Sequence, residues 1–303
     1  MAIHSIASLI LVYNDTEFTD RVCKTLVAGG EVSYIVIVDN SDKDEFININ
    51  KNKFPLYAAN VFYINPGENR GYAAGNNIGI KYILANLSVD YIWIINNDII
   101  PQKNAAGFMI ETIRSCGDKS ICGSVLYYYE DKDTIDENSV IQCYGGGKYY
   151  PAIGKSKLYF KNKHRSELAL LKNKQVDFIM GASMMVPVNA FKELGFIPEE
   201  YFMYYEELDW QTSARKKGYK LIVSEPSEII HMDGLSTKNK KHTYYYYMNR
   251  AAIIFTKKHY AYFLPLVILY RVMEAFFLTS GIKNKYFSIK GIINGIFSAT
   301  ARP

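Results

Sequence analysis

The stretch Tyr91-Ile92-Trp93-Ile94-Ile95-Asn96-Asn97-Asp98 is an apolar, β-branched run that ends abruptly in two amides and one carboxylate. Such a run is typical of a buried strand in a parallel sheet. Ligands of open α/β sheets bind beyond the carboxyl ends of the strands. Asp98 is therefore a candidate ligand for a hard divalent cation, with diphosphate oxygens completing its shell. The alternative is that the polar residues only open a turn and cap a helix near Asn104.

Predicted strands and helices alternate on both sides of this stretch, which favours right-handed βαβ units and a mostly parallel sheet flanked by helices. A polar segment, residues 130–173, is expected to form loops and hairpins over one edge of the sheet. The other strands are expected at residues 6–13, 34–39, 61–65, 121–129, 176–181 and 221–223, and the helices at residues 16–28, 73–87, 104–116 and 189–194.

Two further strand ends carry polar residues that point to a ligand. Asp39 closes the second strand and is expected to point into the same crevice as Asp98, where it would accept hydrogen bonds from a base or a ribose hydroxyl. The third strand leads into Asn69-Arg70-Gly71-Tyr72-Ala73-Ala74-Gly75-Asn76-Asn77, whose small residues let the backbone approach a ligand. His231 follows a later strand. A lone His is more often structural, but near carboxylates it would complete a metal site or bind phosphate.

The stretch Phe202-Met203-Tyr204-Tyr205-Glu206-Glu207-Leu208-Asp209-Trp210 places three carboxylates at the start of a predicted helix. The helix macrodipole favours acidic residues there, which accounts for part of the pattern. The aromatic neighbours would also desolvate a carboxylate, raise its pKa and make it a better base. Arg215 lies about two helical turns beyond Glu207, so it is a candidate partner for Glu207 on the same face.

Composition places the 303-residue chain among globular proteins, because 49% of its residues are apolar and 21% are charged. The length allows one large α/β domain with an appendage. The four cysteines form no C-x-x-C pair and no zinc-type spacing, which is typical of reduced thiols in a cytosolic protein. No nucleic-acid partner is expected.

The net charge of +5 is unevenly distributed along the chain. Residues 238–290 contain ten basic residues and one acidic residue, which gives +9 there and −4 elsewhere, and suggests an anionic partner for that end. Within it, residues 262–278 are apolar but interrupted by Arg271 and Glu274. This pattern suits an interfacial amphipathic segment better than a membrane-spanning helix. The alternative is a helix pair that packs on the rest of the chain or across a dimer interface.

Residues 5–250 resemble the inverting, GT-A-fold glycosyltransferases of family 2, in particular the rhamnosyltransferase-like branch of bacterial surface polysaccharide synthesis. The five signatures that carry the resemblance occur in family order: Leu11-Val12-Tyr13-Asn14, Val38-Asp39-Asn40-Ser41, the turn from Asn69 to Asn77, Asn96-Asn97-Asp98 at the D-x-D place, and Phe202-x-Tyr204-x-Glu206-Glu207-x-Asp209 with Gly218-Tyr219. The last of these resembles the family's F-x-Y-x-E-D-x-D…G-Y acceptor-side motif.

The resemblance implies a GT-A-type, Rossmann-like α/β catalytic domain at residues 1–237, with a nucleotide-sugar half at about 1–100 and an acceptor half at about 101–237. A basic, aromatic, helical extension would follow at residues 238–303. The enzyme would move L-rhamnose from dTDP-rhamnose, or a hexose from a UDP-sugar, with inversion. The acceptor would be a hydroxyl of a polyprenyl-diphosphate-linked or growing surface glycan. The protein is expected in the cytoplasm, peripheral on the inner face of the cell membrane, with a homodimer as one option.

The resemblance also implies a role for each motif residue. Asp98 and His231 would hold Mg²⁺ or Mn²⁺ on the diphosphate, and Glu207 would be the base. Glu206 and Asp209 would position the acceptor or the helix, and the turn Gly181-Ala182-Ser183 would line the acceptor side. The nucleotide sugar would be bound by Tyr13, Asp39, Asn69, Gly71, Gly75, Asn76, Asn97 and Asp98.

Two departures from the family pattern keep an alternative function open. The D-x-D place has lost its first carboxylate, and Glu207 stands where the family has an Asp base. A catalytically weak or inactive sugar-nucleotide-binding scaffold descended from the family would show both departures. A nucleotidylyltransferase is disfavoured, because Tyr13-Asn14-Asp15-Thr16 lacks the Gly-rich, basic loop that would follow its first strand.

Overall fold

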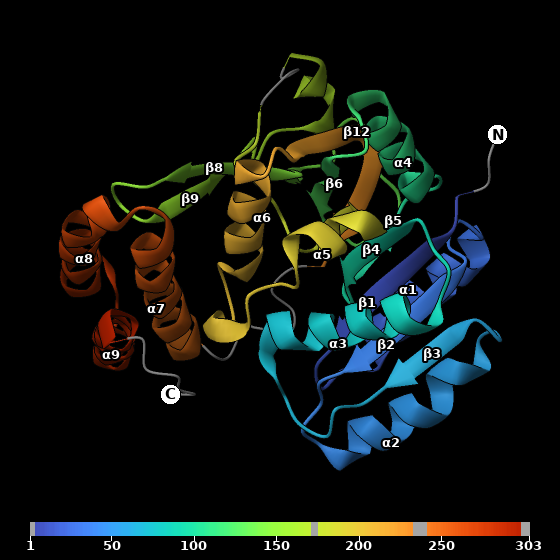
Figure 1. Cartoon of the computed structure of the whole chain (residues 1–303), viewed down its shortest axis with the longest axis horizontal. Coiled ribbons are helices and arrows are strands. Elements are labelled where there is room, and N and C mark those ends of the chain that lie inside the picture. Colours follow the sequence, from blue (N-terminus) through green and yellow to red (C-terminus); the bar gives the residue numbers. More distant parts are fainter. Residues whose placement is uncertain (1–3, 171–174, 233–240, 298–303) are drawn as a thin grey trace.

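The computed structural model describes residues 4–170, 175–232 and 241–297 (Figure 1). Its centre is a mixed, mostly parallel sheet, and β7 (Ile141–Tyr144) extends it by pairing with β6. The strands lie in the order β3 (Val61–Ile64), β2 (Tyr34–Asp39), β1 (Ile6–Val12), β4 (Tyr91–Asn96), β11 (Ser183–Pro187), β6 (Ser120–Tyr128), β12 (Lys220–His231) and β5 (Ile99–Pro101).

Helices cover both faces of this sheet, because its central strands are apolar on both sides. On one face Val22 of α1 (Glu17–Gly29) and Met109 of α4 (Ala105–Cys116) share a buried cluster with Trp93 of β4. On the other face α3 (Gly71–Asn86), α5 (Val188–Leu194) and α6 (Glu206–Lys216) pack on Ile92 and Ile94. The predicted fold class, a mostly parallel sheet flanked by helices, is therefore confirmed.

Some elements were absent from the sequence prediction. Helix α2 (Asp44–Lys53) was not predicted, because it has no apolar stripe and only Asn50 of it is buried. Strands β5 and β11 were not predicted either. Only Ser183 of β11 belonged to an expected turn, and the strand runs antiparallel between β4 and β6. The described part of the predicted loop and hairpin segment, residues 130–170, contains a hairpin as predicted. Its strands β8 (Gly146–Tyr150) and β9 (Lys155–Leu158) make a second small sheet with β10 (Phe178–Ile179).

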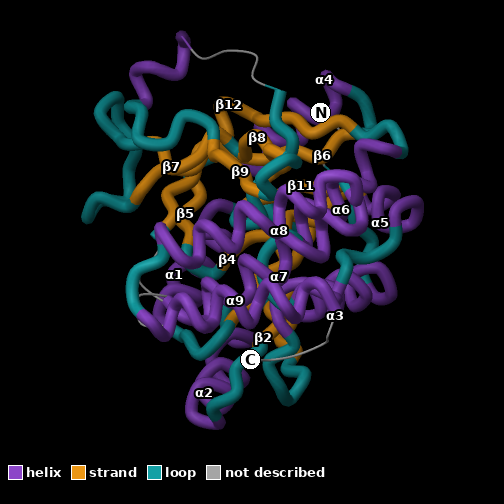
Figure 2. The backbone as a smooth tube through the Cα atoms, turned by 90° about the vertical axis from the view of Figure 1, so that its left-hand side faces the viewer, coloured by secondary structure: helices purple, strands orange, loops and turns teal. Residues whose placement is uncertain are grey.

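The C-terminal part of the described chain consists of helices α7 (Lys241–His259), α8 (Leu264–Met273) and α9 (Ile282–Phe297). They form a layer beside α6 and the β8–β9 hairpin (Figure 1) and cover one end of the molecule (Figure 2). Phe255 of α7 shares a buried cluster with Tyr205 and Leu208, so this layer is packed onto the α/β part. The predicted domain boundary at 237/238 lies outside the described residues.

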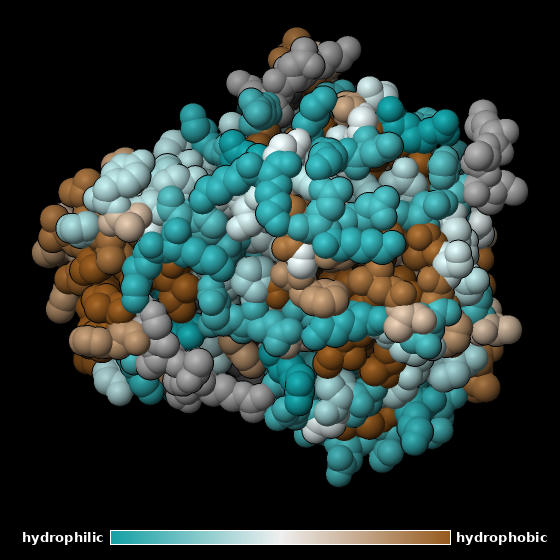
Figure 3. All heavy atoms as spheres, viewed as in Figure 1, coloured by the Kyte–Doolittle hydropathy of each residue, from teal (hydrophilic) through white to brown (hydrophobic). Residues whose placement is uncertain are grey.

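One face of the C-terminal helices exposes large apolar side chains. Figure 3 shows these residues gathered at the end of the molecule that α8 and α9 form. By length and composition the stretch Ala261–Leu278 could cross a membrane, since its mean hydropathy is 1.7 and 17% of it is buried. Arg271, however, is buried against the protein and pairs with Glu274. The exposed side chains include Leu266, Leu269, Met273, Phe276, Phe277 and Leu278.

Candidate active site

Pairing between β5 and β12 brings the candidate metal ligands together. Strand β4 ends at Asn96, a two-residue turn follows, and β5 then pairs antiparallel with β12 so that Ile99 lies opposite His231. The Asp98 carbonyl accepts a hydrogen bond of 2.9 Å from the Met232 N–H. As a result Asp98 Oδ1 lies 3.2 Å from His231 Nε2. Two residues that are 133 positions apart in the sequence therefore meet at the end of the sheet.

The hydrogen bonds around His231 point its Nε2 atom at Asp98. Its Nδ1 lies 2.8 Å from the Gln142 carbonyl oxygen, which only accepts, so Nδ1 carries a proton and donates. Nε2 also lies 3.4 Å from the Asn96 amide nitrogen. Burial raises the pKa of the Asp98 carboxyl, but the proximity of His231 and smaller contributions from Asn96 and the backbone outweigh burial and hold this pKa below its ordinary value. Asp98 is therefore ionised at neutral pH.

These two side chains fit a divalent cation as a pair of ligands. Asp98 Oδ1 is buried and makes no hydrogen bond of good geometry within the described chain. Adjacent ligands of an octahedral ion held at about 2.1 Å lie about 3 Å apart, close to the separation of Oδ1 and Nε2. A second hydrogen bond on the far ring nitrogen is also common for histidines that bind metal. In the described ranges no group of three or more His, Cys, Asp or Glu side chains could hold a metal.

The hydrogen bonds of Asn97 and of the start of α4 test the alternative that Asp98 caps this helix. The Asn97 amide donates to Asp15 Oδ2 at 2.9 Å and to Thr19 Oγ1 at 3.1 Å, which fixes the turn to the start of α1. The first N–H groups of α4 bind the carboxylate of Glu31, at 2.7 Å from Asn104 and 3.0 Å from Ala106. The capping alternative for Asp98 is therefore wrong, and contact of Asn97 with a nucleotide stays a prediction.

Asp39 does not point into the crevice, which corrects the expected orientation of this side chain. It is fully buried, and its Oδ1 accepts hydrogen bonds from the Ser41 N–H and hydroxyl. Its Oδ2 accepts from Asn50 and from the Tyr63 hydroxyl, both at 2.8 Å. Asn50 lies on α2, the helix missed in the sequence, and it turns Asp39 inward. Asp39 therefore organises the end of β2, and direct contact with a nucleoside stays a prediction.

Tyr13, at the end of β1, lies on the surface beside this strand end. Its ring is 39% exposed, and its hydroxyl donates to Asp42 Oδ2 at 3.1 Å. A partly exposed aromatic ring with a polar edge is suited to stacking on a base. The structure therefore leaves Tyr13 accessible to a nucleotide, and that contact stays a prediction.

The small residues of the 69–77 turn serve close packing inside the protein. Gly71 has a φ of 81°, and a Cβ there would lie 2.3 Å from the Phe202 carbonyl oxygen, which accepts a 2.9 Å hydrogen bond from the Tyr72 N–H. A Cβ on Gly75 would lie 2.4 Å from Leu11 Cδ1. These glycines were expected to make room for a ligand. The structure shows that protein atoms occupy the space that a Cβ would need. Their contact with a nucleotide stays a prediction.

Two asparagines complete this turn. Asn69 Oδ1 accepts a hydrogen bond of 2.9 Å from the Gly71 N–H, which holds the backbone in its left-handed conformation. Asn76 is fully buried, and its amide donates to the Tyr72 carbonyl at 3.0 Å. Asn76 Oδ1 has no hydrogen-bond partner within the described chain. Both side chains shape the start of α3, and their predicted nucleotide contacts are not tested by the structure.

The carboxylates of Glu206 and Glu207, at the start of α6, lie near the start of α3 and near Gly181. The Tyr72 hydroxyl donates to the Gly181 carbonyl at 2.9 Å. A Cβ on Gly181 would lie 3.6 Å from Glu207 Oε1, so Glu207 and Tyr72 both border Gly181. The Asn96 N–H donates to the Ala182 carbonyl at 3.1 Å, which places Glu207 at the same end of the sheet as the turn of Asp98.

Burial sets the protonation of this pair. It raises the pKa of both carboxyls, and the charge of Glu207 raises that of Glu206 further, to well above its ordinary value. Glu206 is 2% exposed, and its Oε2 has no hydrogen-bond partner among the described residues. We therefore assign Glu206 as the protonated member at neutral pH. Glu207, which is only half-buried, is the member that can exchange a proton with a bound molecule.

The aromatic loop before α6 is held in an unusual conformation. Phe202, Tyr204 and Tyr205 have φ angles of 69°, 69° and 71°, a region that costs a bulky residue about 1–3 kcal/mol. Such conformations persist where the surroundings enforce them, and they cluster at functional sites. Here α7 packs on the loop, since Tyr247 stacks on Phe202 with ring centres 5.0 Å apart. The loop therefore presents Glu206 and Glu207 in a conformation that depends on the C-terminal helices.

Asp209 links α6 to α7 and supports the helix from inside the protein. It is fully buried and accepts hydrogen bonds from Tyr201 at 2.7 Å, Lys258 at 2.8 Å and His259 at 2.6 Å. Burial raises the pKa of Asp209, but these donors outweigh it and hold the pKa below its ordinary value. Of the two roles predicted for Asp209, the structure supports positioning of the helix.

Asp209→Asn is expected to lower the free energy of unfolding by about 1–3 kcal/mol, because charge-assisted bonds to Lys258 and His259 are lost. Lys258 is 42% exposed, so water screens its share. The stabilisation from Asp209 is present above the pKa of the unfolded chain and is lost as pH falls through the lower folded pKa. Urea denaturation near pH 7 measures the change. The exposed partner Glu200 provides the control, since Glu200→Gln should cost well under 1 kcal/mol. Equal stability of Asp209→Asn and the unmodified protein would contradict the role of Asp209.

Two contacts at the site were not foreseen, and one expected ion pair does not form. Tyr72 stood within a quoted motif without a role, and Gln142 lies in the polar segment, where no pattern singles it out. Gly181 was predicted to line the acceptor side, and it borders the candidate base Glu207. Arg215 pairs with Asp177 at 3.1 Å and not with Glu207, because β10 lies beside that face of α6.

Comparison with known proteins identifies the family. The family model described as glycosyl transferase family 2 matches residues 9–195. The chain belongs to glycosyl transferase family 2. The match includes Asp39, the 69–77 turn and Asp98, whereas the α6 carboxylates and His231 lie beyond it. The predicted enzyme class, a glycosyltransferase, is confirmed, and the rhamnosyltransferase-like branch stays a prediction.

One curated relative and several solved structures are similar to this family 2 enzyme. The low-salt glycan biosynthesis hexosyltransferase Agl10 of Haloferax volcanii is 24% identical over 242 residues, which cover 80% of this chain and 72% of the relative. GalNAc-T7 with UDP, GalNAc and Mn²⁺ superposes with a TM-score of 0.67 at 13% identity, covering 98% of this chain and 56% of that one. The mannosyltransferase PcManGT of Pyrobaculum calidifontis, with GDP-Man and Mn²⁺, superposes with a TM-score of 0.57 at 10% identity. This match covers 97% of this chain and 87% of PcManGT. These two structures confirm the GT-A fold.

Proposed function

We propose that this glycosyltransferase moves a sugar from a nucleotide diphosphate sugar to an acceptor hydroxyl with inversion at the anomeric carbon. The observation that carries the proposal is the half-buried Glu207 beside Gly181, with a raised pKa, at the same end of the sheet as the Asp98–His231 pair. A base on one side and a candidate diphosphate site on the other match a single displacement. The acceptor oxygen bonds to the anomeric carbon as the bond to the diphosphate breaks.

The chain's own groups divide the work in this proposal. Glu207 takes the proton of the attacking hydroxyl, and its raised pKa suits it to that transfer at neutral pH. Glu206 stays neutral behind it, which avoids a second negative charge next to the base. Asp98 and His231 would hold Mg²⁺ or Mn²⁺, which supplies neutralising charge to the leaving diphosphate. The Mn²⁺ in the solved structures of GalNAc-T7 and PcManGT supports a divalent cation.

Two donors are favoured by different observations. The order of the motifs resembles rhamnosyltransferases and favours L-rhamnose from dTDP-rhamnose. The name of the hexosyltransferase relative and the UDP in the GalNAc-T7 structure favour a hexose from a UDP-sugar. The acceptor in this proposal is a hydroxyl of a lipid-linked or growing surface glycan. Tyr13, Asn97 and the 69–77 turn border the donor side, where the nucleoside would lie.

The experiment that tests the proposal is nucleoside diphosphate release from a panel of UDP-, dTDP- and GDP-sugars with Mg²⁺, Mn²⁺ or EDTA. Slow hydrolysis of one donor is expected, since transferases leak their donor to water when no acceptor is present. NMR of the product formed with an added acceptor then reports the anomeric configuration. No turnover and no nucleotide binding by calorimetry would favour the non-catalytic scaffold, and a retained configuration would overturn inversion.

The pH dependence of kcat/KM is expected to reflect the raised pKa of Glu207. A base loses activity as pH falls through its pKa, and burial places that pKa above the ordinary value of 4.5. The decline on the acidic side of the profile should therefore be centred above pH 4.5. Initial rates between pH 4 and 8 at saturating divalent cation measure it, with donor affinity followed in parallel. A decline centred at or below pH 4.5 would remove Glu207 as the buried base.

We further propose that the protein works at the cytoplasmic face of a membrane, with the exposed face of α8 in the interface. Leu266, Leu269 and Met273 recur at helical spacing on that face and are 53%, 58% and 51% exposed. Phe277→Ser, at a side chain 79% exposed, is expected to weaken co-sedimentation with phosphatidylglycerol vesicles severalfold and leave donor hydrolysis unchanged. Leu56→Ser, at an equally exposed residue far from α8, is the control. If Phe277→Ser abolished a dimer and left vesicle binding unchanged, the exposed apolar face would instead bind a second copy of the chain.

A further inference from the structure

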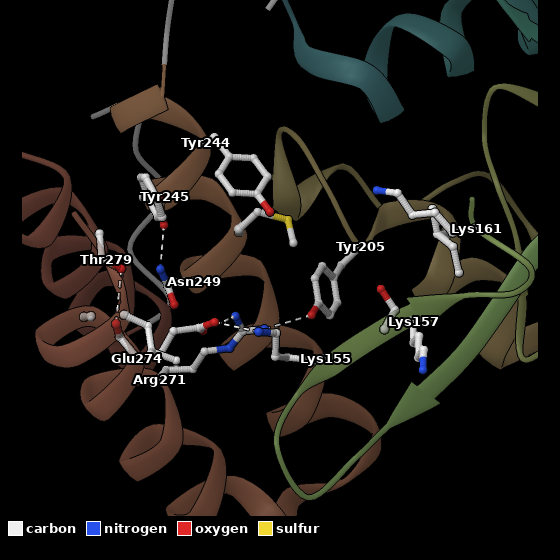
Figure 4. A pocket seen from close by; sticks show the side chains of 15 residues that line it. Lys155, Lys157, Lys161, Tyr205, Tyr244, Tyr245, Asn249, Arg271, Glu274 and Thr279 are labelled. Carbon is white, nitrogen blue, oxygen red and sulfur yellow. Dashed lines mark hydrogen bonds and ion pairs between the residues drawn. The ribbon is translucent and has the colours of Figure 1, made fainter. Parts of the chain in front are cut away.

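A pocket of about 610 Å³ lies between the β8–β9 hairpin and the C-terminal helices. Figure 4 shows Lys155, Arg271 and Glu274 close together on one side of the pocket, Lys157 and Lys161 on the other, and Tyr205 between the two groups. Its volume falls in the range of pockets that bind small ligands. The polar side chains that the argument uses are Lys155, Lys157, Lys161, Tyr205, Tyr244 and Arg271.

The lining of the pocket is strongly cationic. Four basic side chains face one carboxylate, Glu274, which gives a net charge of +3 (four minus one). Glu274 is shared by Lys155 at 2.6 Å and Arg271 at 3.1 Å. Lys157 and Lys161 are exposed and form no ion pair with any acidic residue in the described ranges. An anion that enters the pocket would therefore meet two cations whose charge is not already compensated.

Buried polar atoms in the wall also point to a ligand. Arg271 is 4% exposed, and its Nε has no hydrogen-bond partner in the described part of the chain. Asn249 is 6% exposed, and its Oδ1 likewise has none there. Buried polar atoms are satisfied in the great majority of cases, so two orphans in one pocket wall require an explanation. The guanidinium is held in place, because its Nη2 donates to the Tyr205 hydroxyl at 3.1 Å.

The lining of the pocket joins an apolar surface to Tyr205, the residue that directly precedes the α6 carboxylates. Leu278 lines the pocket and is 74% exposed, and Phe277 and Ile282 beside it are 79% and 89% exposed. On the inner side Tyr205 directly precedes Glu206, and consecutive Cα atoms lie about 3.8 Å apart. A ligand that spans the pocket would thus have an apolar end at the exposed helices and a polar end toward α6.

We propose that this pocket binds the diphosphate of an isoprenoid-linked acceptor, with the isoprenoid on the apolar surface formed by Phe277, Leu278 and Ile282 and the sugar directed toward Glu207. Lys157 and Lys161 supply charge, the Tyr244 hydroxyl donates a hydrogen bond to a phosphate oxygen, and the buried guanidinium of Arg271 adds positive charge from the pocket wall. This inference rests on the proposed function, because it assigns the lipid-linked acceptor of that reaction to a site.

Calorimetric binding of farnesyl diphosphate to the full chain tests the pocket without relying on turnover. The probe is expected to bind, and Lys157→Ala/Lys161→Ala is expected to weaken binding at least tenfold. The matched control Lys148→Ala/Lys163→Ala removes two other exposed lysines near the hairpin, which do not line the pocket, and should bind as the unmodified protein does. Asp98→Ala should also retain binding, which separates the pocket from the nucleotide site. Equal loss in both double variants would overturn the proposal.

Three further ligands test whether the pocket recognises an isoprenoid diphosphate, free phosphate or a lipid headgroup. Farnesol should bind at least tenfold more weakly than farnesyl diphosphate, and so should inorganic diphosphate. Equal affinity of inorganic diphosphate would assign a free-phosphate site, and complete displacement by phosphatidylglycerol vesicles would assign a bilayer headgroup; either result overturns the proposal. Donor hydrolysis is measured in parallel. Probe binding without any sugar-nucleotide turnover would remove the proposed transfer but keep the diphosphate site, and turnover without probe binding would do the reverse.

Discussion

Glu207→Gln is expected to lower sugar transfer by about 10²–10⁴-fold, the range that a positioned general base contributes. The amide keeps the size of the side chain beside Gly181 but cannot accept the proton of the attacking hydroxyl. Nucleotide binding should survive, because the proposed function gives Glu207 a role toward the acceptor and not toward the nucleotide. The measurement is kcat with donor and acceptor saturating, together with the dissociation constant of the nucleoside diphosphate.

Glu206→Gln is the matched control for this prediction. Burial and the charge of Glu207 hold the pKa of Glu206 well above its ordinary value, so Gln replaces a carboxyl that is already neutral. We expect less than a tenfold change in kcat. If Glu206→Gln is the variant that loses activity and Glu207→Gln is not, the two roles are exchanged. If neither variant changes the rate of a measurable reaction, the base lies elsewhere.

Asp98→Ala is expected to lower turnover by about 10²–10³-fold, as the loss of one strong electrostatic contact to a developing charge does in other active sites. The effect should appear in donor hydrolysis as well as in transfer, because the proposed role of Asp98 is toward the leaving diphosphate. His231→Gln should move in the same direction, since His231 Nε2 lies 3.2 Å from Asp98 Oδ1 and shares its proposed role as a metal ligand.

EDTA provides the internal check on the role of Asp98. If the carboxylate acts by holding a metal, its removal and chelation remove the same contribution, so their effects are not additive. EDTA should abolish turnover of the unmodified enzyme and barely change that of Asp98→Ala. Turnover that resists EDTA in the unmodified enzyme would remove the metal role. A variant as active and as EDTA-sensitive as the unmodified enzyme would place the metal elsewhere.

The parts of the fold that were predictable from sequence are those with strong local patterns. Continuous apolar runs such as β4 mark buried parallel strands, and their polar ends mark the edge of the sheet where the site lies. The acidic start of α6 was predictable for the same reason. Helix α2 was missed because it buries little apolar surface, and the direction of Asp39 was missed with it.

Long-range pairing could not be predicted from a single sequence. His231 faces Asp98 only because β12 pairs with β5, and nothing in either segment specifies that partner. Gln142 reaches His231 from the polar segment for a similar reason. Arg215 has suitable helical spacing for Glu207, but the tertiary position of Asp177 decides its partner. Side-chain direction and strand partners depend on packing across the molecule, which local periodicity does not encode.

Exchange of C-terminal helices between related transferases is constrained by Lys258 and His259, the two hydrogen-bond donors that α7 brings to Asp209. A chimera that took all three helices from a relative without these donors would leave a buried carboxylate with fewer partners and would weaken α6, whatever new target the helices carried. The safer junction lies after His259, at the end of α7. Retargeting this enzyme by recombination therefore means replacing α8 and α9 and keeping α7 as part of the α/β scaffold.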